Sequence, residues 1–313
     1  MDNFVKKFKL PMSKLLFLLF AGPFYLISLL PLKIHYFVSD IIIFIIGRIL
    51  RYRQTVVTIN ITRSFPELRY GQIEERVKAF YGHLAEIIAE SMWMVSASRK
   101  KLNKIAHFHN PELLKMQFAA GKSVIIVGGH IGNWELLTKM DHFGEGNPVG
   151  YSGDELKFIY KKQHSSLSDK FVRWIRESRS GIELIESNKA ARYILKNRDK
   201  QACYFLFADQ APLPGSKFVT NMLNQQTLMI NGPEIISRGV DCPVIFINMV
   251  RVKRGCYKIK FTLITDKPSE CEDGFITNRY AQLIESSVRD NPENWLWSHK
   301  RWKRGLEDNI IKG

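Results

Sequence analysis

Beyond Gly121 the sequence alternates short apolar runs with amphipathic stretches, and this alternation restricts the possible folds more than any other feature. The apolar runs predict strands at residues 123–127, 181–185, 202–207, 243–252 and 257–264. The stretches between and around them predict helices at residues 72–95, 133–143, 155–176, 188–196, 229–237 and 275–288. Alternating strands and helices indicate an α/β fold in which helices flank a mixed sheet.

Two apolar stretches, residues 15–30 and 36–49, precede this region, and basic residues flank them. The first is short for a transmembrane span, which needs about 20 apolar residues, and it lacks the cleavage site of a signal peptide. We expect residues 1–50 to form a hydrophobic helical membrane anchor that spans once or lies in one leaflet. A buried hairpin of a soluble core is the alternative.

The charge of the chain limits its partners. The 313 residues include 46 basic and 30 acidic side chains, which gives a formal net charge of +16. An anionic membrane surface, an acidic protein or nucleic acid would suit this excess, but the sequence contains no recognisable nucleic-acid-binding module. The four cysteines form no C-x-x-C pair, which argues against a zinc site and a disulfide framework and favours a reducing compartment.

The strongest signal for chemistry is the run GGHIGNWE at residues 128–135, between a predicted strand and a predicted helix. Ligands of α/β sheets bind at the carboxyl ends of strands, and a helix amino terminus offers free N–H groups to negative charge. His130 and Glu135 would point about 140° apart on one helix. They can therefore meet only if His130 lies on the loop and Glu135 in the first helical turn, which the glycines permit.

A carboxylate on one imidazole nitrogen would fix the tautomer of His130 and leave the other nitrogen to take a proton from a hydroxyl. The alternative is a structural loop histidine beside a glutamate that begins a helix. Competing catalytic signatures, G-x-S-x-G and H-E-x-x-H, are missing from the sequence.

The run at residues 129–135 resembles the H-x4-D/E box of the lysophospholipid acyltransferase superfamily, and its surroundings resemble the lauroyl/myristoyl acyltransferases of lipid A biosynthesis. Three further segments resemble that family: the D-Q step at 207–210, the arginine block at 179–181 and the carboxyl-terminal signature at 292–303. The resemblance extends from about residue 15 to residue 304. One segment departs from it, because residues 218–224 read FVTNMLN where the family has an F-x-P-F-F-G pattern.

The resemblance implies a glycerolipid acyltransferase-like fold in residues 51–306, with a helical lead-in at 51–110 and a catalytic core at 111–306. It also implies an enzyme on the cytoplasmic face of the cell inner membrane, without a metal or organic cofactor. The expected reaction transfers a fatty acyl chain from an acyl-carrier protein or acyl-CoA to a hydroxyl of a lipid A precursor. A lysophospholipid or an aminolipid is the alternative acceptor, and a catalytically silent membrane-binding homologue is the non-enzymatic alternative.

In this family, His130 would be the general base and Glu135 its orienting partner. The residues expected to bind substrate or stabilise charge are Gly132, Asn133, Arg176, Arg179, Asp209 and Gln210. Arg179 is the first choice for the arginine block, and Arg176 is the other candidate.

The carboxyl-terminal segment interleaves three tryptophans with basic residues between positions 295 and 304. Such a pattern is typical of a membrane interface and of a patch that binds anionic head groups, and an acidic acyl-carrier protein could bind it too. A solvated basic face with the tryptophans packed beneath it is the alternative.

Overall fold

A seven-stranded sheet organises the computed structural model, which describes residues 12–304. The strand order is β1-β9-β8-β2-β5-β3-β4, and all neighbours are parallel except β8 and β9, which form an antiparallel hairpin. The prediction of a mixed sheet flanked by helices is confirmed. The strands are β1 (Ala106–Phe108), β2 (Val124–Gly128), β3 (Leu156–Tyr160), β4 (Glu183–Glu186), β5 (Cys203–Phe207), β8 (Val244–Lys253) and β9 (Cys256–Thr265).

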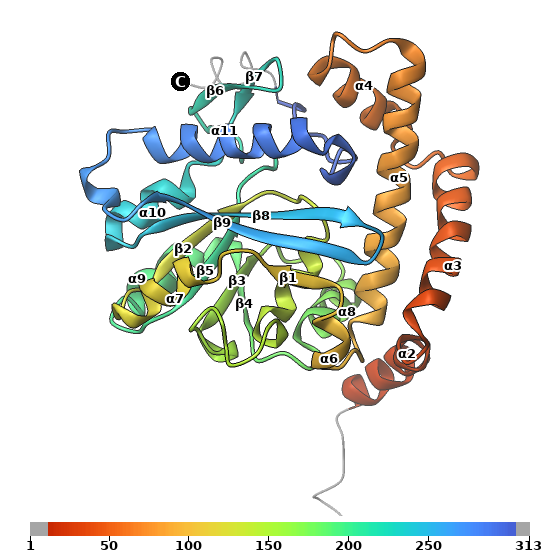
Figure 1. The fold of residues 1–313 in the computed structure, drawn as a ribbon, viewed down its shortest axis with the longest axis horizontal. Helices are drawn as coiled ribbons and strands as arrows, with labels where there is room; N and C mark the ends of the chain where they lie inside the picture. Colours follow the sequence, from red (N-terminus) through yellow and green to blue (C-terminus); the bar gives the residue numbers. More distant parts are fainter. Residues whose placement is uncertain (1–11, 305–313) are drawn as a thin grey trace, which may run out of the picture.

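Helices cover both faces of this sheet (Figure 1). One face carries α4 (Gln54–Ser64), α9 (Ala190–Lys196), α10 (Gly232–Val240) and α11 (Phe275–Asp290). The other carries α6 (Arg99–Leu102), α7 (Glu112–Ala119), α8 (Ser166–Glu177) and the 3-10 helix η3 (Trp134–His142). The remaining short helical turns are η4 (Gly153–Glu155), η5 (Ser187–Lys189), η6 (Pro268–Glu270) and η7 (Pro292–Asn294).

Strand β2 lies at the centre of the sheet and is buried on both sides. Ile125 and Val127 pack into the core on the α11 side, while Val124 and Ile126 pack into the core on the α7 side. All four side chains are inaccessible to solvent. A central parallel strand must be apolar on both faces, which is why the uninterrupted apolar run at residues 123–127 predicts this strand.

Helix α5 (Tyr70–Trp93) crosses the edge at which the parallel strands end, and α3 (Leu32–Ile43) packs against it from outside (Figure 1). Before α3 lies α2 (Met12–Ser28), and the π-helix η2 (Phe44–Ile49) follows it. Among the described residues, no single helix is long and apolar enough to cross a membrane. The pair α2 and α3 meets that length and composition only jointly, with a bend of 109° between its two parts.

The first eleven residues of the predicted anchor and residues 305–306 of the predicted domain lie outside the described part of the chain. Within the described part, one predicted element is wrong. Residues 155–176 do not form a single helix, because they contain strand β3 and then helix α8. The side chains of Leu156, Phe158 and Tyr160 alternate inward along β3, which is the two-residue period of a strand.

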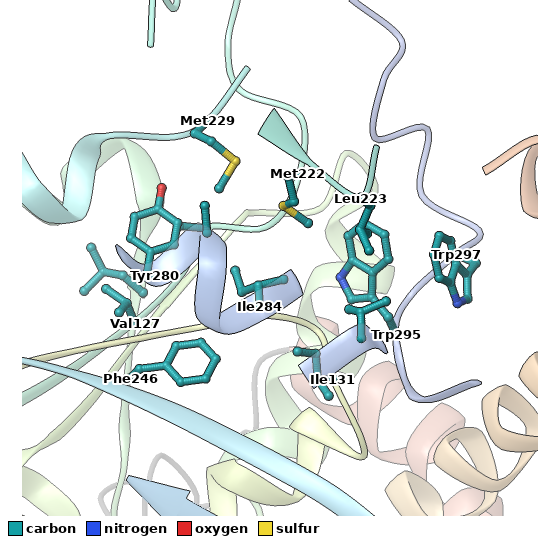
Figure 2. Close-up of a cluster of buried hydrophobic side chains, with 14 of the residues drawn as sticks. Val127, Ile131, Met222, Leu223, Met229, Phe246, Tyr280, Ile284, Trp295 and Trp297 are labelled. Carbon is teal, nitrogen blue, oxygen red and sulfur yellow. The ribbon is translucent and has the colours of Figure 1, made fainter. Parts of the chain in front are cut away.

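The segment that departs from the family pattern lies in a separate hairpin of β6 (Val219–Met222) and β7 (Gln225–Leu228). Leu223 and Asn224 form its turn with positive φ angles of 53° and 60°. Met222 and Leu223 belong to the buried cluster around α11 (Figure 2). The hairpin is therefore part of the main hydrophobic core.

Candidate functional site

The His130 loop, residues 128–135, leaves the carboxyl end of β2 and passes close beneath β8. Gly132 has a φ of +62°, and a Cβ atom at this position would overlap the carbonyl oxygen of Met249 in β8. The amide of Gly132 donates a hydrogen bond of 2.9 Å to the carbonyl of Asn294. Only glycine fits this conformation and this distance from the neighbouring strand, so the loop has little freedom where it passes β8.

His130 is held by Asp209, which follows β5, the strand next to β2. The imidazole Nδ1 lies 2.7 Å from Asp209 Oδ1, and the backbone amide of His130 donates to Asp209 Oδ2 at 2.8 Å. The indole Nε1 of Trp295 donates to the same Oδ2 at 2.8 Å. Asp209 thus receives hydrogen bonds at both carboxylate oxygens while its side chain is only 2% exposed.

These contacts determine the charge of Asp209. Burial alone would raise the pKa of this carboxyl, but the His130 ring, the His130 amide and the Trp295 indole outweigh burial and lower it to about 2. An ionised carboxylate only accepts hydrogen bonds, so the shared proton lies on His130 Nδ1. The opposite nitrogen, Nε2, therefore keeps its lone pair in the neutral ring.

The side chain of His130 is 18% exposed, and its Nε2 is the ring nitrogen that Asp209 does not bind. Gln210 Nε2 lies 3.3 Å from His130 Nε2, and the rings of Trp134 and Phe207 flank the imidazole with centroid distances of 5.2 and 5.5 Å. A hydroxyl that displaced the Gln210 amide could donate to this nitrogen. The arrangement is suited to general-base catalysis.

Glu135 does not orient His130 in this structure, which corrects the pairing predicted from the H-x4-E spacing. Its carboxylate instead forms two hydrogen bonds with Arg176 of α8, at 2.8 Å to Nε and 2.7 Å to Nη2. Burial raises the pKa of Glu135, but the Arg176 charge and hydrogen bonds and the nearby His130 outweigh burial and hold it below its usual value. Glu135 is therefore an ionised group beside the imidazole.

Of the two candidate arginines, the structure brings Arg176 to the site. Arg179 follows α8 with a φ of 58°; its guanidinium lies 3.4 Å from the Ser96 carbonyl, and its own carbonyl accepts from His142. The side chain of Asn133 is fully buried and donates to Glu90. Asn133 therefore offers no accessible surface to a substrate in this structure.

The carboxyl-terminal segment lies against the His130 loop. The amide of Leu296 donates to the His130 carbonyl, and Ile131 and Trp295 form an antiparallel bridge. Figure 2 shows Ile131 and Trp295 together in the buried cluster. Trp295 and Trp297 are 3% and 1% exposed, so these two tryptophans pack beneath the surface and do not face a membrane interface. Trp302 is half-buried against the same core.

Two more residues of this segment contact distant parts of the core, and one of them, His299, lies beside the D-Q step. His299 Nε2 accepts a hydrogen bond from the amide of Ala211, and burial lowers the pKa of this imidazole to about 4, which keeps it neutral. The buried Arg301 donates to the carbonyl of Leu228 and to the sulfur of Met229. The sequence pattern identified this segment but not its contacts, because more than 70 residues separate these partners along the chain.

Lys139 is a further buried residue that the sequence does not single out. It lies in η3 and is inaccessible to solvent, and its ammonium donates to the carbonyls of Ile175 and Arg176 at 3.1 and 2.9 Å and to that of Ser178. These carbonyls end α8, the helix that carries Arg176. Lys139 therefore fixes the end of α8 next to Glu135.

Comparison with known protein families identifies the family of this chain. Among curated proteins, no significant match to the chain exists. The family model described as bacterial lipid A biosynthesis acyltransferase matches residues 1–304, which is nearly the whole chain and includes every residue of the site. The chain therefore belongs to the bacterial lipid A biosynthesis acyltransferase family and is an acyltransferase.

Proposed function

We propose that this acyltransferase moves a fatty acyl group from an acyl-carrier protein or acyl-CoA to a hydroxyl of a lipid A precursor, with His130 as general base. The observation that carries the proposal is the pair of His130 and Asp209, with Nδ1 and Oδ1 2.7 Å apart, which leaves the opposite imidazole nitrogen free to accept a proton. Family membership supports the class of acceptor.

The chemical step follows from this geometry. His130 Nε2 removes the proton of the acceptor hydroxyl while its oxygen attacks the carbonyl carbon of the donor thioester. The carbon–sulfur bond then breaks, and the imidazolium returns the proton to the leaving thiolate. Asp209 holds the productive tautomer and stabilises the imidazolium that forms in between.

The role of Glu135 in this proposal is electrostatic. Its negative charge lies near His130 and would stabilise the positive charge that forms on the ring during the transfer, and Arg176 keeps the carboxylate ionised and in place. Arg176, Arg179 and Gln210 remain the candidates for binding the acceptor or the developing oxyanion. Residues 51–306 would form the catalytic domain, and residues 1–50 would attach it to the cytoplasmic face of the inner membrane.

Mass spectrometry of lipid A from a deletion strain tests the function. The strain is complemented with the wild type or with His130→Ala. We expect lipid A to lack one acyl chain in the deletion strain and only the wild type to restore it. If lipid A is unchanged while a phospholipid or aminolipid loses an acyl chain, the acceptor is wrong. If no lipid changes in the deletion strain, the proposed acyl transfer is wrong. If His130→Ala restores the missing chain, the catalytic role of His130 is wrong.

A further inference from the structure

Glu90 of α5 is completely buried, and it contacts groups from two different elements. Its Oε1 accepts a 2.7 Å hydrogen bond from the hydroxyl of Tyr36, which belongs to α3. Its Oε2 accepts a 2.7 Å hydrogen bond from the side-chain amide of Asn133, in the His130 loop. A single carboxyl group thus connects the second apolar helix of the chain to the loop that carries His130 and Glu135.

Within the described residues Glu90 accepts hydrogen bonds but forms no ion pair with an arginine or lysine. Arg251, in the β8–β9 hairpin, binds Glu86 instead, one turn earlier on α5, with hydrogen bonds of 2.8 and 2.9 Å. Burial raises the pKa of Glu90 despite the hydrogen bonds from Asn133 and Tyr36. A buried carboxyl group is costly unless its hydrogen bonds are kept, so Glu90 holds both of its partners in place.

The position of Asn133 determines the course of the His130 loop between β2 and η3. It lies between Gly132, whose amide is bound by the Asn294 carbonyl, and Trp134, which begins η3. Its own carbonyl accepts a hydrogen bond from the amide of Leu136. Because the loop passes from β2 to η3 here, the position of Asn133 sets the distance between His130 and Glu135.

We propose that Glu90 is a positioning residue that couples the seating of α3 on α5 to the conformation of the His130 loop. This inference rests on the proposed function for its kinetic consequence only. When α3 is seated, the Tyr36 hydroxyl satisfies Oε1, and Glu90 is held where Oε2 meets Asn133. When α3 moves away, a buried oxygen loses its partner, Glu90 shifts toward other donors, and the loop loses its support.

Other contacts make α3 suitable for such coupling. The outer side of α3 exposes large apolar side chains, among them Phe37 at 67% and Ile41 at 47%. On its inner side the guanidinium of Arg254 lies over the Tyr36 ring, 4.7 Å from its centroid, and binds Asp40. Anything that binds the apolar side of α3 would therefore act on the same helix that holds Glu90.

Hydrogen–deuterium exchange of the full-length protein in detergent tests the coupling without reference to activity. We expect Tyr36→Phe, which removes only the hydroxyl, and Glu90→Leu to increase exchange at least tenfold in peptides covering residues 128–136. Glu75→Leu, an exposed site on the same helix, is the matched control and should leave these peptides unchanged. If Tyr36→Phe increases exchange in α3 alone, the coupling is wrong.

Acyl-transfer kinetics on the same variants test the positioning role. We expect Glu90→Leu to lower kcat at least tenfold and to change KM less than threefold. Glu90→Gln should keep kcat within threefold of the wild type, because the carbonyl of the introduced glutamine can accept from Tyr36. The amide of that glutamine can donate to the Asn133 Oδ1, which is buried without a hydrogen-bond partner among the described residues.

The double variant Tyr36→Phe/Glu90→Leu should have the kcat of Glu90→Leu alone, because both changes break one connection. A kcat that falls by the product of the two single effects would show independent roles and overturn the proposal, as would a Glu90→Gln variant as slow as Glu90→Leu. Failure of the proposed function is recognised separately, because the wild-type enzyme would then not acylate the lipid A precursor while the exchange results would still stand.

Discussion

Asp209 holds His130 at two atoms, the ring Nδ1 and the backbone amide. This double contact fixes both the rotation of the ring and the place of the residue in the loop. Trp295 adds a third N–H group from the other end of the chain. A carboxylate that is buried and fully hydrogen-bonded has little freedom to move, and it keeps the imidazole equally fixed.

The role of Asp209 predicts the effect of Asp209→Asn. The amide of asparagine can donate its N–H to Nδ1, which moves the imidazole proton to Nε2 and removes the lone pair that accepts the substrate proton. We expect kcat to fall by roughly 10³- to 10⁴-fold with KM nearly unchanged. Asp199→Asn, at a 94% exposed side chain, is the control. Should Asp209→Asn keep kcat within tenfold while Glu135→Gln abolishes activity, Glu135 would be the orienting carboxylate after all.

Alanine substitutions at two glycines of similar backbone conformation distinguish the cost of a positive φ angle from the cost of steric overlap. Gly132 and Gly146 have φ angles of +62° and +64°, but only a Cβ at Gly132 meets another atom, the Met249 carbonyl oxygen. We expect Gly146→Ala to reduce the free energy of unfolding by about 1 kcal/mol. Gly132→Ala should cost at least about 2 kcal/mol more and lower kcat, because β8 or the loop must move. Urea denaturation with equal losses for both variants would contradict this.

The sequence predicts the residues of the site better than their partners. His130 follows from a glycine-rich run after a buried strand, which is a local pattern. Asp209 is also identified, but its pairing with His130 depends on β2 and β5 being neighbours, which no local pattern reveals. Spacing alone favours Glu135 as the partner of His130, but the Glu135 carboxylate binds Arg176, which is 41 residues away in the sequence.

At the scale of elements, the contact between η3 and the carboxyl end of α8 positions Glu135 next to Arg176. Lys139 of η3 donates to three carbonyls there, which satisfies groups that a helix end leaves unpaired. A positive charge at a helix carboxyl terminus also suits the helix dipole. This contact fixes η3 and α8 relative to each other, so that Glu135 and Arg176 form their hydrogen bonds.

Lys139 predicts an unusual dependence of stability on pH. Burial lowers its pKa to about 8, from the ordinary lysine value of 10.5. Between these values the unfolded chain holds a proton that the folded chain has released, so this group makes the free energy of unfolding rise with pH. We expect the stability of the wild type relative to Lys139→Met to increase from pH 8 to pH 10, by at most about 3 kcal/mol.

Chemical denaturation at several pH values measures this difference, and Lys115→Met, at an exposed position of α7, serves as the control. A difference between wild type and Lys139→Met that stays constant or decreases over this range would show that Lys139 keeps its proton in the folded protein. The same Lys139→Met variant should lower kcat, because the end of α8 loses its support.

The predicted and the observed elements differ at residues 155–176, where apolar residues fit both a helical and a strand spacing. Residues 155–176 contain enough charged and apolar residues in helical spacing to suggest one long helix. The alternation of Leu156, Phe158 and Tyr160 is only five residues long, but it places β3 beside β5 and β4. Burial against the sheet outweighs the weaker helical preference of such a short segment. This burial depends on strands that are distant in the sequence, so a pattern within residues 155–176 does not reveal it.

Viewed as a whole, the molecule has an amino-terminal pair of helices that is far more apolar on its surface than the rest. Leu26 and Phe37 are 66% and 67% exposed on α2 and α3. Exposed apolar side chains gathered on neighbouring elements typically mark a binding surface. Together with the net charge of +16, they favour association with an anionic bilayer.

A charge placed on this surface tests that association. We expect Leu26→Glu combined with Phe37→Glu to reduce binding to vesicles that contain anionic lipid at least tenfold, because the buried apolar area falls and two negative charges are added. Met116→Glu, at a 65% exposed residue of α7, should bind like the wild type. Flotation assays measure the bound fraction, and equal binding by all three proteins would exclude α2 and α3 as the membrane-binding surface.

The contact between the carboxyl-terminal segment and the His130 loop also bears on synthesis. Trp295, Leu296 and Asn294 are among the last described residues, yet they hold Asp209 and the loop in place. During translation the apolar helices α2 and α3 emerge before these residues. A nascent chain thus exposes its apolar helices before its site can form, and a transcript that ends before residue 294 yields a protein without the groups that hold Asp209 and the loop.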